Sequence, residues 1–360
     1  MSTRKVSTQW LLASVLVMAV VILAGCSTDP TPSSTPFLKV EPATNAITQI
    51  YDAAKAEGSL AIMSFNSTYA DLASGPFAER FPGIVVEAQL ANTPEMTARI
   101  AAQAQSGVYE TDLVQGSAGS VLALADRGLI AGPGDVDWAS LGYAQELLLV
   151  DGHLPVQWDF VYAHGYNTEL VDLADLPQTL EGFTDPQWSG RIIASPFLYP
   201  SGMAFVALRH GEEATVDLAK RIFDADLVLS DSAESLLGSG EASLMVHVSI
   251  NRMIKDKLSG APVDYFFTSV AGAARIGLAM VKEAPNPNAA KLFNYWLATP
   301  EGKAALFEAS AQALVAGPGE GNEIIRRVAE SGTELVLESD ANWRERARIT
   351  GVVRKAVLGQ

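Results

Sequence analysis

The sequence predicts an α/β protein with two lobes, each a mixed sheet flanked by helices, joined by crossover strands. Strand-like and helix-like segments alternate along the chain, which favours parallel strands with crossover helices. About 335 residues follow the N-terminal signal segment, more than one compact core usually contains. The pattern also starts afresh near residue 190, which indicates a second α/β unit.

The first 45 residues are predicted to serve export and attachment. Two basic residues precede a short apolar run that ends in small residues, the pattern of a secretory signal over residues 1–25. The run is shorter than the roughly 20 residues of a membrane-spanning helix. Its Leu-Ala-Gly-Cys ending resembles the lipobox of bacterial lipoproteins, which makes Cys26 the site of lipid attachment; an ordinary signal with a chance cysteine is the alternative. Residues 26–45 are rich in proline and small polar residues and predict a flexible tether.

Composition argues against several classes of function. The net charge of −16 and the lack of a basic patch argue against nucleic-acid binding. Cys26 is the single cysteine, so its lipidation leaves none for a disulfide, a thiolate nucleophile or a cysteine-based zinc site. A hydrophobic content of 48% predicts a folded body, and no later apolar run approaches membrane-spanning length.

The first lobe opens with three strand–helix pairs. Pro82-Gly83 stops the first helix, and Thr93 caps the second with Pro94 at its first position. The expected elements are strands at 59–65, 84–90 and 112–115 and helices at 70–81, 93–105 and 120–126.

The second half of the chain completes both lobes. After an extended stretch at 147–167, the expected elements are strands at 191–195, 243–249, 263–267 and 273–282 and helices that open near residues 201, 288 and 300. We assign residues 46–156 plus 272–360 to lobe 1 with the C-terminal helices, and residues 157–271 to lobe 2. The hinge is expected within 156–162 and 272–277.

Several segments in a fixed order resemble the extracellular solute-binding proteins of ABC importers, which have the type II periplasmic-binding fold. The resembling subgroup includes iron(III)-, thiamine- and 2-aminoethylphosphonate-binding proteins. The segments are residues 77–86, 97–105, 166–168, 176–179, 184–193, 240–242 and 282–302. The resemblance implies a monomeric binding protein, not an enzyme and without a cofactor. Such a protein is held by its lipid at the outer face of the cytoplasmic membrane, where it delivers a small-molecule or ion ligand to a membrane permease.

Polar residues that follow strands are the candidate ligand contacts, because ligands of open α/β sheets collect at the carboxyl ends of strands. In lobe 1 these residues are Asn66, Ser67 and Thr68 after the first strand, and Gly116 and Ser117 after the third. Each group also precedes a helix, whose N-terminus favours anions. Simple helix capping is the alternative for each group.

In lobe 2, Ser201, Gly202 and Met203 follow the strand at 191–195 and are expected to open a helix that can hold a phosphate, phosphonate or carboxylate. Capping is again the alternative. Trp158 and Asp159 on the crossover strand would suit an amine-bearing ligand, with core packing as the alternative for Trp158.

A ferric-iron site is the main alternative within the family resemblance. The iron(III) members bind metal through adjacent tyrosines in lobe 2, and this chain has no Tyr-Tyr pair. Glu241, Tyr199 or Tyr162 can still supply oxygen ligands, whereas a lone His247 does not make a site and is interpreted as a core or pocket-wall residue. A small polar or anionic solute is therefore the favoured ligand.

Two other classes of function are alternatives to a binding protein. An exported hydrolase would require catalytic motifs such as Gly-x-Ser-x-Gly or His-Glu-x-x-His, and the sequence contains neither. A structural or adhesive lipoprotein would not need two α/β units with polar residues at strand ends. The expected mechanism is hinge closure, in which ligand bridges both lobes and stabilises the closed form.

Overall fold

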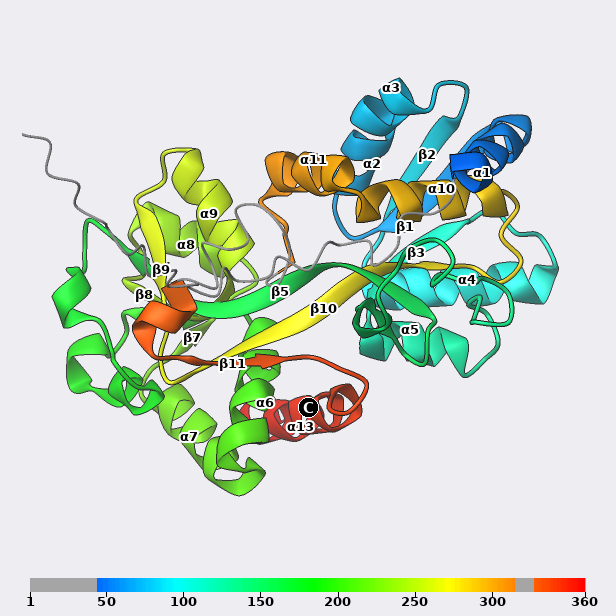
Figure 1. Cartoon of the computed structure of the whole chain (residues 1–360). Helices are drawn as coiled ribbons and strands as arrows, with labels where there is room; N and C mark the ends of the chain where they lie inside the picture. Colours follow the sequence, from blue (N-terminus) through cyan, green and yellow to red (C-terminus); the bar gives the residue numbers. More distant parts are fainter. Residues whose placement is uncertain (1–43, 315–326, 360) are drawn as a thin grey trace, which may run out of the picture. The chain divides into compact units, whose positions relative to one another are not determined.

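The computed structural model describes residues 44–314 and 327–359 (Figure 1). The predicted signal, Cys26 and all but the last two residues of the predicted tether lie outside these ranges. Within them, none of the helices combines the length and apolar character that crossing a bilayer requires.

The described strands form one continuous mixed sheet. Its main order is β2-β1-β3-β10-β5-β8-β6-β7; β11 also pairs with β10, and β4 and β9 pair with β5. The strands are β1 (Ser59–Ser64), β2 (Val85–Leu90), β3 (Leu113–Ser117), β4 (Leu148–Leu149), β5 (Leu154–Asn167), β6 (Ile192–Ala194), β7 (Val228–Leu229), β8 (Leu244–Ser249), β9 (Val263–Phe266), β10 (Val270–Met280) and β11 (Glu334–Leu337). The strands β1, β2 and β3 are parallel to one another, whereas β10 runs antiparallel to both β3 and β5.

The helices cover this sheet and connect its strands. They are α1 (Thr44–Glu57), α2 (Thr68–Leu72), α3 (Ala78–Arg80), α4 (Thr93–Ser106), α5 (Ala118–Ala125), α6 (Leu198–His210), α7 (Glu212–Asp224), α8 (Ala233–Ser239), α9 (Ile250–Leu258), α10 (Pro287–Ala298), α11 (Pro300–Ser310) and α13 (Trp343–Leu358). The helix predicted at 70–81 is interrupted, because Gly75 has non-helical dihedral angles and Pro76 follows it.

Buried side chains form two separate hydrophobic cores. Core 1 includes Leu60, Phe77, Leu278, Phe293 and Trp296 from the predicted lobe 1. Core 2 includes Phe183, Tyr199, Phe205, Val246 and Val353 from the predicted lobe 2 and the C-terminal helix.

The strands β5 and β10 pass from one core to the other, and Figure 1 shows them as the two long strands through the middle of the molecule. Val156 and Trp158 of β5 belong to core 1, whereas Val161 belongs to core 2. On β10 the change falls between Ala274 and Ile276. The crossing therefore lies within both stretches expected to form the hinge.

The C-terminal helix differs from its predicted assignment to lobe 1. Ile349, Val353 and Val357 of α13 are buried in core 2, where α13 packs against α6 and α7. Only Trp343, at its first turn, is buried in core 1. An amphipathic stripe can be read from sequence, but either core can accept it, so the pattern does not identify the partner.

Candidate ligand-binding site

The carboxyl ends of strands from both cores meet at the crossing strands. Ser117, the last residue of β3, pairs with Ile276 on β10, which pairs in turn with Trp158 on β5. Ser249, the last residue of β8, pairs directly with Tyr162 on β5. Trp158 and Tyr162 are four residues apart, or about 13 Å along a strand. Ser117 and Ser249 are also separated by three strand spacings across the sheet, from β3 over β10 and β5 to β8, so they flank the crossing strands from the two cores.

The loop after β1 largely satisfies its own polar groups. The side-chain oxygen of Asn66 accepts a hydrogen bond from the Thr68 amide (3.1 Å), and the Ser64 hydroxyl donates to the Asn66 carbonyl (2.7 Å). Thr68 is buried, whereas Ser67 is exposed and its side chain makes no capping bond. Capping by the Ser67 hydroxyl, the expected alternative, is therefore not formed, because the Asn66 oxygen takes the Thr68 amide instead; within this loop Ser67 faces solvent.

Gln115 links the two strand ends of core 1 and was not among the predicted contacts. Its side-chain oxygen accepts a hydrogen bond from the Phe65 amide (3.2 Å), and its side chain is buried. An amide side chain at the carboxyl end of the predicted strand 112–115 was the available signal. The next residue, Gly116, leaves space for the Ser120 hydroxyl, which lies 2.6 Å from where a Cβ on Gly116 would be.

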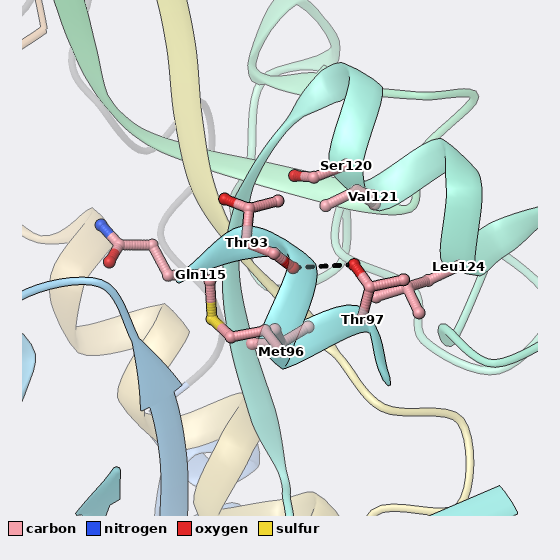
Figure 2. Close-up of a pocket in the computed structure, with 8 residues that line it drawn as sticks. Thr93, Met96, Thr97, Gln115, Ser120, Val121 and Leu124 are labelled. Carbon is pink, nitrogen blue, oxygen red and sulfur yellow. Dashed lines mark hydrogen bonds between the residues drawn. The ribbon is translucent and has the colours of Figure 1, made fainter. Parts of the chain in front are cut away.

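A small pocket opens beside this strand end, between the first turns of α4 and α5 (Figure 2). Its lining combines three hydroxyl groups and one amide side chain with apolar side chains. The lining residues are Thr93, Met96, Thr97, Val114, Gln115, Ser120, Val121 and Leu124. The Ser120 hydroxyl accepts from the Ser117 amide (3.0 Å) and donates to the Ser117 carbonyl (2.9 Å), so it fixes the start of α5.

In core 2 the helix predicted to open near Ser201 begins earlier, at Leu198. The Ser195 hydroxyl accepts from the amides of Phe197 (3.2 Å) and Leu198 (3.4 Å), and the Ser195 carbonyl accepts from the Tyr199 amide. Pro200, which follows Tyr199, has no N–H to donate. The first N–H groups of the helix are therefore bonded within its own loop. Ser201 and Gly202, the predicted anion cradle, lie inside the helix and are buried, so the prediction of a cradle there was wrong.

Gly202 approaches a protein side chain closely. A Cβ on Gly202 would lie 2.5 Å from Nδ1 of His247, and Met203 Sδ lies 3.3 Å from Nε2 of the same ring. His247 is buried, has a φ of 55°, and sits in a bulge of β8 opposite His164. Burial lowers the pKa of His247 to about 3, so the ring is neutral at physiological pH. These features agree with the interpretation of His247 as a packed core residue.

The two ends of β8 have different surroundings. At its carboxyl end the Ser249 hydroxyl donates to Asn251 Oδ1 (3.0 Å), so Ser249 does not cap α9. Glu241 precedes the other end of β8; it is exposed and accepts from the Ser239 hydroxyl (3.2 Å). Glu241 is thus not brought together with the other candidates, whereas Ser249 and Asn251, which were not predicted, stand beside the crossing strands.

Buried charges lie where the crossing strands change core. Asp159 forms an ion pair with Arg275 (Oδ1 to Nε, 3.6 Å), and both side chains are almost fully buried. Arg275 also donates to the Glu146 carbonyl. The carboxylate is therefore neutralised by Arg275, and the expected amine site at Trp158 and Asp159 is not formed in this structure. Trp158 is buried in core 1, as in its packing alternative.

Residues 73–316 match the family described as bacterial extracellular solute-binding protein. The chain belongs to this family. The family is one of solute-binding proteins rather than enzymes, and its members are extracellular. None of the curated proteins searched matches the chain.

Solved structures of solute-binding proteins share the fold of this solute-binding protein. Iron-bound HitA from Pseudomonas aeruginosa is 19% identical with a TM-score of 0.67, over 83% of this chain and 99% of HitA. AfuA from Actinobacillus pleuropneumoniae, with fructose-6-phosphate bound, is 17% identical with a TM-score of 0.63, over 84% of this chain and 99% of AfuA. Apo FutA2 from Synechocystis is 18% identical with a TM-score of 0.61, over 84% of this chain and 98% of FutA2. These matches confirm the predicted two-lobed α/β fold.

The described part of this solute-binding protein contains no cluster of three or more His, Cys, Asp or Glu side chains that could hold a metal ion. The two tyrosines named as oxygen donors are buried. The Tyr199 hydroxyl donates to the Ala219 carbonyl (2.7 Å), and burial raises the pKa of Tyr162 to about 12. A phenolate ligand at either position would thus have to be formed inside a packed core, and at Tyr199 at the expense of an existing hydrogen bond.

Proposed function

We propose that this protein is the solute-binding component of an ABC importer that captures a small polar or anionic solute between its two lobes. The observation that carries the proposal is the position of Ser117 and Ser249 at strand ends that flank the crossing strands, one on the core 1 side and one on the core 2 side. Family membership supports the same function. The solute is delivered to a membrane permease, and the lipid on Cys26 holds the protein beside it.

The proposed mechanism is closure about β5 and β10. A solute that contacts the Ser117 region and the Ser249–Asn251 region at once stabilises the closed arrangement over the open one. The free energy of this bridging sets the affinity, and the permease recognises the closed form. Residues of only one core would bind the solute without driving closure.

The surroundings of Ser249 favour a solute with hydrogen-bond acceptors. Because the Ser249 side chain does not cap α9, the first N–H groups of this helix are not paired with its N-cap side chain. Helix N-termini stabilise anionic groups. The neutralisation of Asp159 by Arg275 removes the acidic group that would favour an amine. A phosphate, phosphonate or carboxylate solute fits these features best.

Ferric iron remains the second candidate because HitA, which shares the fold, carries iron. AfuA shares the fold equally and carries a sugar phosphate, so the fold does not choose between them. The buried phenols of Tyr199 and Tyr162 and the distant position of Glu241 favour the organic anion.

A thermal-shift screen of the purified protein tests the function. The probes are inorganic phosphate, 2-aminoethylphosphonate, fructose-6-phosphate, thiamine phosphate, spermidine and ferric citrate, because a ligand of the native state raises the melting temperature. A hit is then tested with Ser249→Ala, which should weaken binding at least about tenfold, or about 1.4 kcal/mol. Ser259→Ala, at the exposed far end of α9, is the matched control. A screen in which no probe raises the melting temperature would contradict the proposal. Turnover of model esters by the purified protein would also contradict it.

A further inference from the structure

A third segment of the chain joins the two cores, in addition to β5 and β10. The strand β11 pairs in parallel with the first half of β10, from Val270 to Ala273. The strand β3 pairs with the second half, from Ile276 to Met280. The residues of β10 between these two pairings lie where the cores meet, and the chain that follows β11 covers them.

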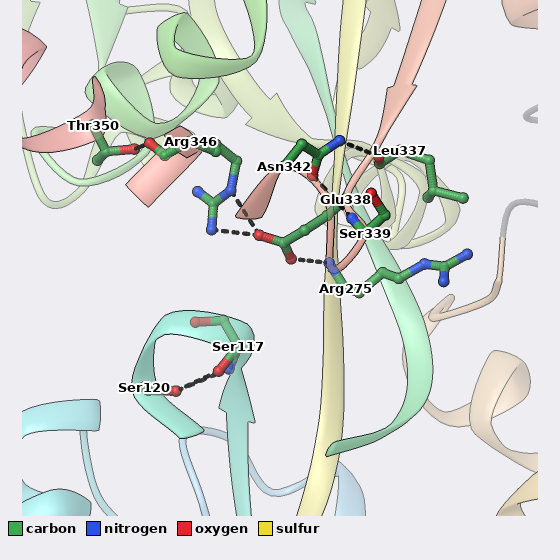
Figure 3. A network of polar contacts seen from close by, with 9 residues as sticks. All are labelled: Ser117, Ser120, Arg275, Leu337, Glu338, Ser339, Asn342, Arg346 and Thr350. Atoms are coloured by element: carbon green, nitrogen blue, oxygen red, sulfur yellow. Dashed lines mark hydrogen bonds and ion pairs between the residues drawn. The ribbon is translucent and has the colours of Figure 1, made fainter. Parts of the chain in front are cut away.

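Glu338 fills the gap between β11 and β3. Its carboxylate is completely buried and accepts hydrogen bonds from the Arg275 amide (2.8 Å) and from Nε of Arg346 (2.7 Å), as Figure 3 shows. The Glu338 amide also donates to the Ala273 carbonyl (2.9 Å). Charge-assisted bonds of this kind are short and strong, and removing one partner leaves a buried charge uncompensated. Glu338 therefore fixes the start of α13 to β10.

The next residues bind core 1. Asp340 Oδ1 accepts from the Val150 amide (2.8 Å), and Arg344 pairs with Asp151 (3.4 Å). The backbone at Val150 and Asp151 is left-handed, with φ of 57° and 53°, so this turn is held by a contact from far along the chain. Trp343 is buried in core 1 between these contacts.

The same helix then turns to core 2. Arg346 lies over the Phe205 ring of α6 (5.1 Å from the ring centroid), and the later apolar residues of α13 are buried in core 2. The first turn of α13 thus belongs to one core and the rest to the other. This connection spans both cores within about one and a half helical turns.

We propose that residues 338–344, the strap, limit how far the two cores can rotate about β5 and β10. Two strands alone allow twisting and bending at the crossing, whereas a third connection anchored in both cores removes part of that freedom. The strap then sets the range of interlobe distances that the protein samples without solute. The solute shifts this population towards the closed form. This inference rests on the hinge closure of the proposed function, but it concerns the protein without solute.

Distances between spin labels on the two cores test the strap. The labels are placed at Asp52→Cys in α1 and Lys220→Cys in α7, both exposed, in a Cys26→Ser background that removes the single native cysteine. Electron–electron double resonance is recorded without solute. The double variant Asp340→Ala/Arg344→Ala, which removes exposed contacts to core 1, should broaden the distance distribution and add longer distances.

Arg348→Ala is the matched control, because Arg348 lies on the same helix but pairs with Glu212 and Glu345 on the core 2 side. It should leave the distribution unchanged. Glu338→Gln should broaden the distribution as well, and circular dichroism melting verifies that each variant is folded. An unchanged distribution in both the double variant and Glu338→Gln overturns the proposal, as does equal broadening in Arg348→Ala. A failed solute screen leaves this measurement unaffected, so the two proposals fail separately.

Discussion

The imidazole ring of His247 lies directly against the backbone of Gly202, in the space that any larger residue at position 202 would need. A Cβ there would be 2.5 Å from Nδ1 and 2.7 Å from Cδ2 of the ring. Since His247 is buried in a β8 bulge and contacts Met203 Sδ, the ring cannot move aside without disturbing core 2.

Gly202→Ala is therefore expected to destabilise the protein by about 1–3 kcal/mol, the usual result of overpacking a core. Gly351→Ala is the control, because it also lies within a helix but has nothing within 4 Å of its Cβ position. There the alanine should stabilise by about 0.5–1 kcal/mol. Urea unfolding of both variants measures the difference, and equal stability of the two would contradict this packing account.

Acid should destabilise the fold through its buried histidines. Burial lowers the pKa of His164 well below 6.5 and that of His247 to about 3, so both are neutral in the folded state. Their surroundings are Thr268, Met203 and aromatic rings, and the His247 amide donates to His164 Nδ1 (3.4 Å). Because the unfolded chain binds these protons from about pH 6.5 downward, stability should fall as the pH drops from 6.5 towards 3.

The slope should approach about 1.4 kcal/mol per pH unit for each imidazole. Urea midpoints between pH 8 and pH 5 measure it, in a range where exposed carboxylates scarcely titrate. His247→Leu should reduce the slope, whereas His210→Asn, at the exposed end of α6, should retain it. A flat profile in the native protein would show that the two rings are not held neutral.

Lys303 should produce a rise in stability towards alkaline pH. Its Nζ donates to the Gln157 carbonyl inside the protein, and burial lowers its pKa well below 10.5 despite the opposing effect of Asp159. The unfolded chain then holds more protons than the folded chain up to about pH 10.5, so the free energy of unfolding should increase from pH 7 to pH 10. Lys303→Met should abolish the increase, and the exposed Lys220→Met should not.

Glu57 should stabilise the start of α10 from a distant part of the chain. Its carboxylate accepts from the amides of Asn288 (3.0 Å) and Ala289 (2.9 Å) and from the Asn288 side chain (2.6 Å). Glu57→Ala should cost roughly 1–2 kcal/mol, as the loss of a charged helix cap does. Glu308→Ala, exposed on α11, should change stability by less than about 0.5 kcal/mol, and thermal melts distinguish the two.

Much of the fold could be predicted because its signals are local. Apolar runs gave β1, β2 and β3, and α4 begins at Thr93 as expected. The predicted cap was wrong by one residue, because Asn92 rather than Thr93 accepts the Glu95 amide. The predicted start of α6, near Ser201, was wrong. The helix begins at Leu198 because the hydroxyl of Ser195, three residues earlier, accepts hydrogen bonds from the Phe197 and Leu198 amides. From sequence alone, the hydroxyl groups of Ser195 and Ser201 are equally plausible caps for this helix.

The candidate site was harder to predict because it depends on pairing between distant residues. The neutralisation of Asp159 by Arg275 joins positions 116 residues apart, and no local pattern indicates it. The bulge that turns His247 onto Gly202 likewise depends on the register of β8 against β5. Ser249 and Asn251 become candidates only when the end of β8 is seen beside Tyr162.

The location of α13 also determines the order in which the chain can fold. Core 2 needs Ile349, Val353 and Val357, while its first strand residues come from β5, nearly 200 residues earlier. A chain still being synthesised or threaded through a membrane therefore lacks a face of core 2 until almost its last turn has emerged. Contacts of such long range slow folding. Late completion of this core therefore delays stable packing of the part of the molecule around core 2 until the C-terminal helix is available.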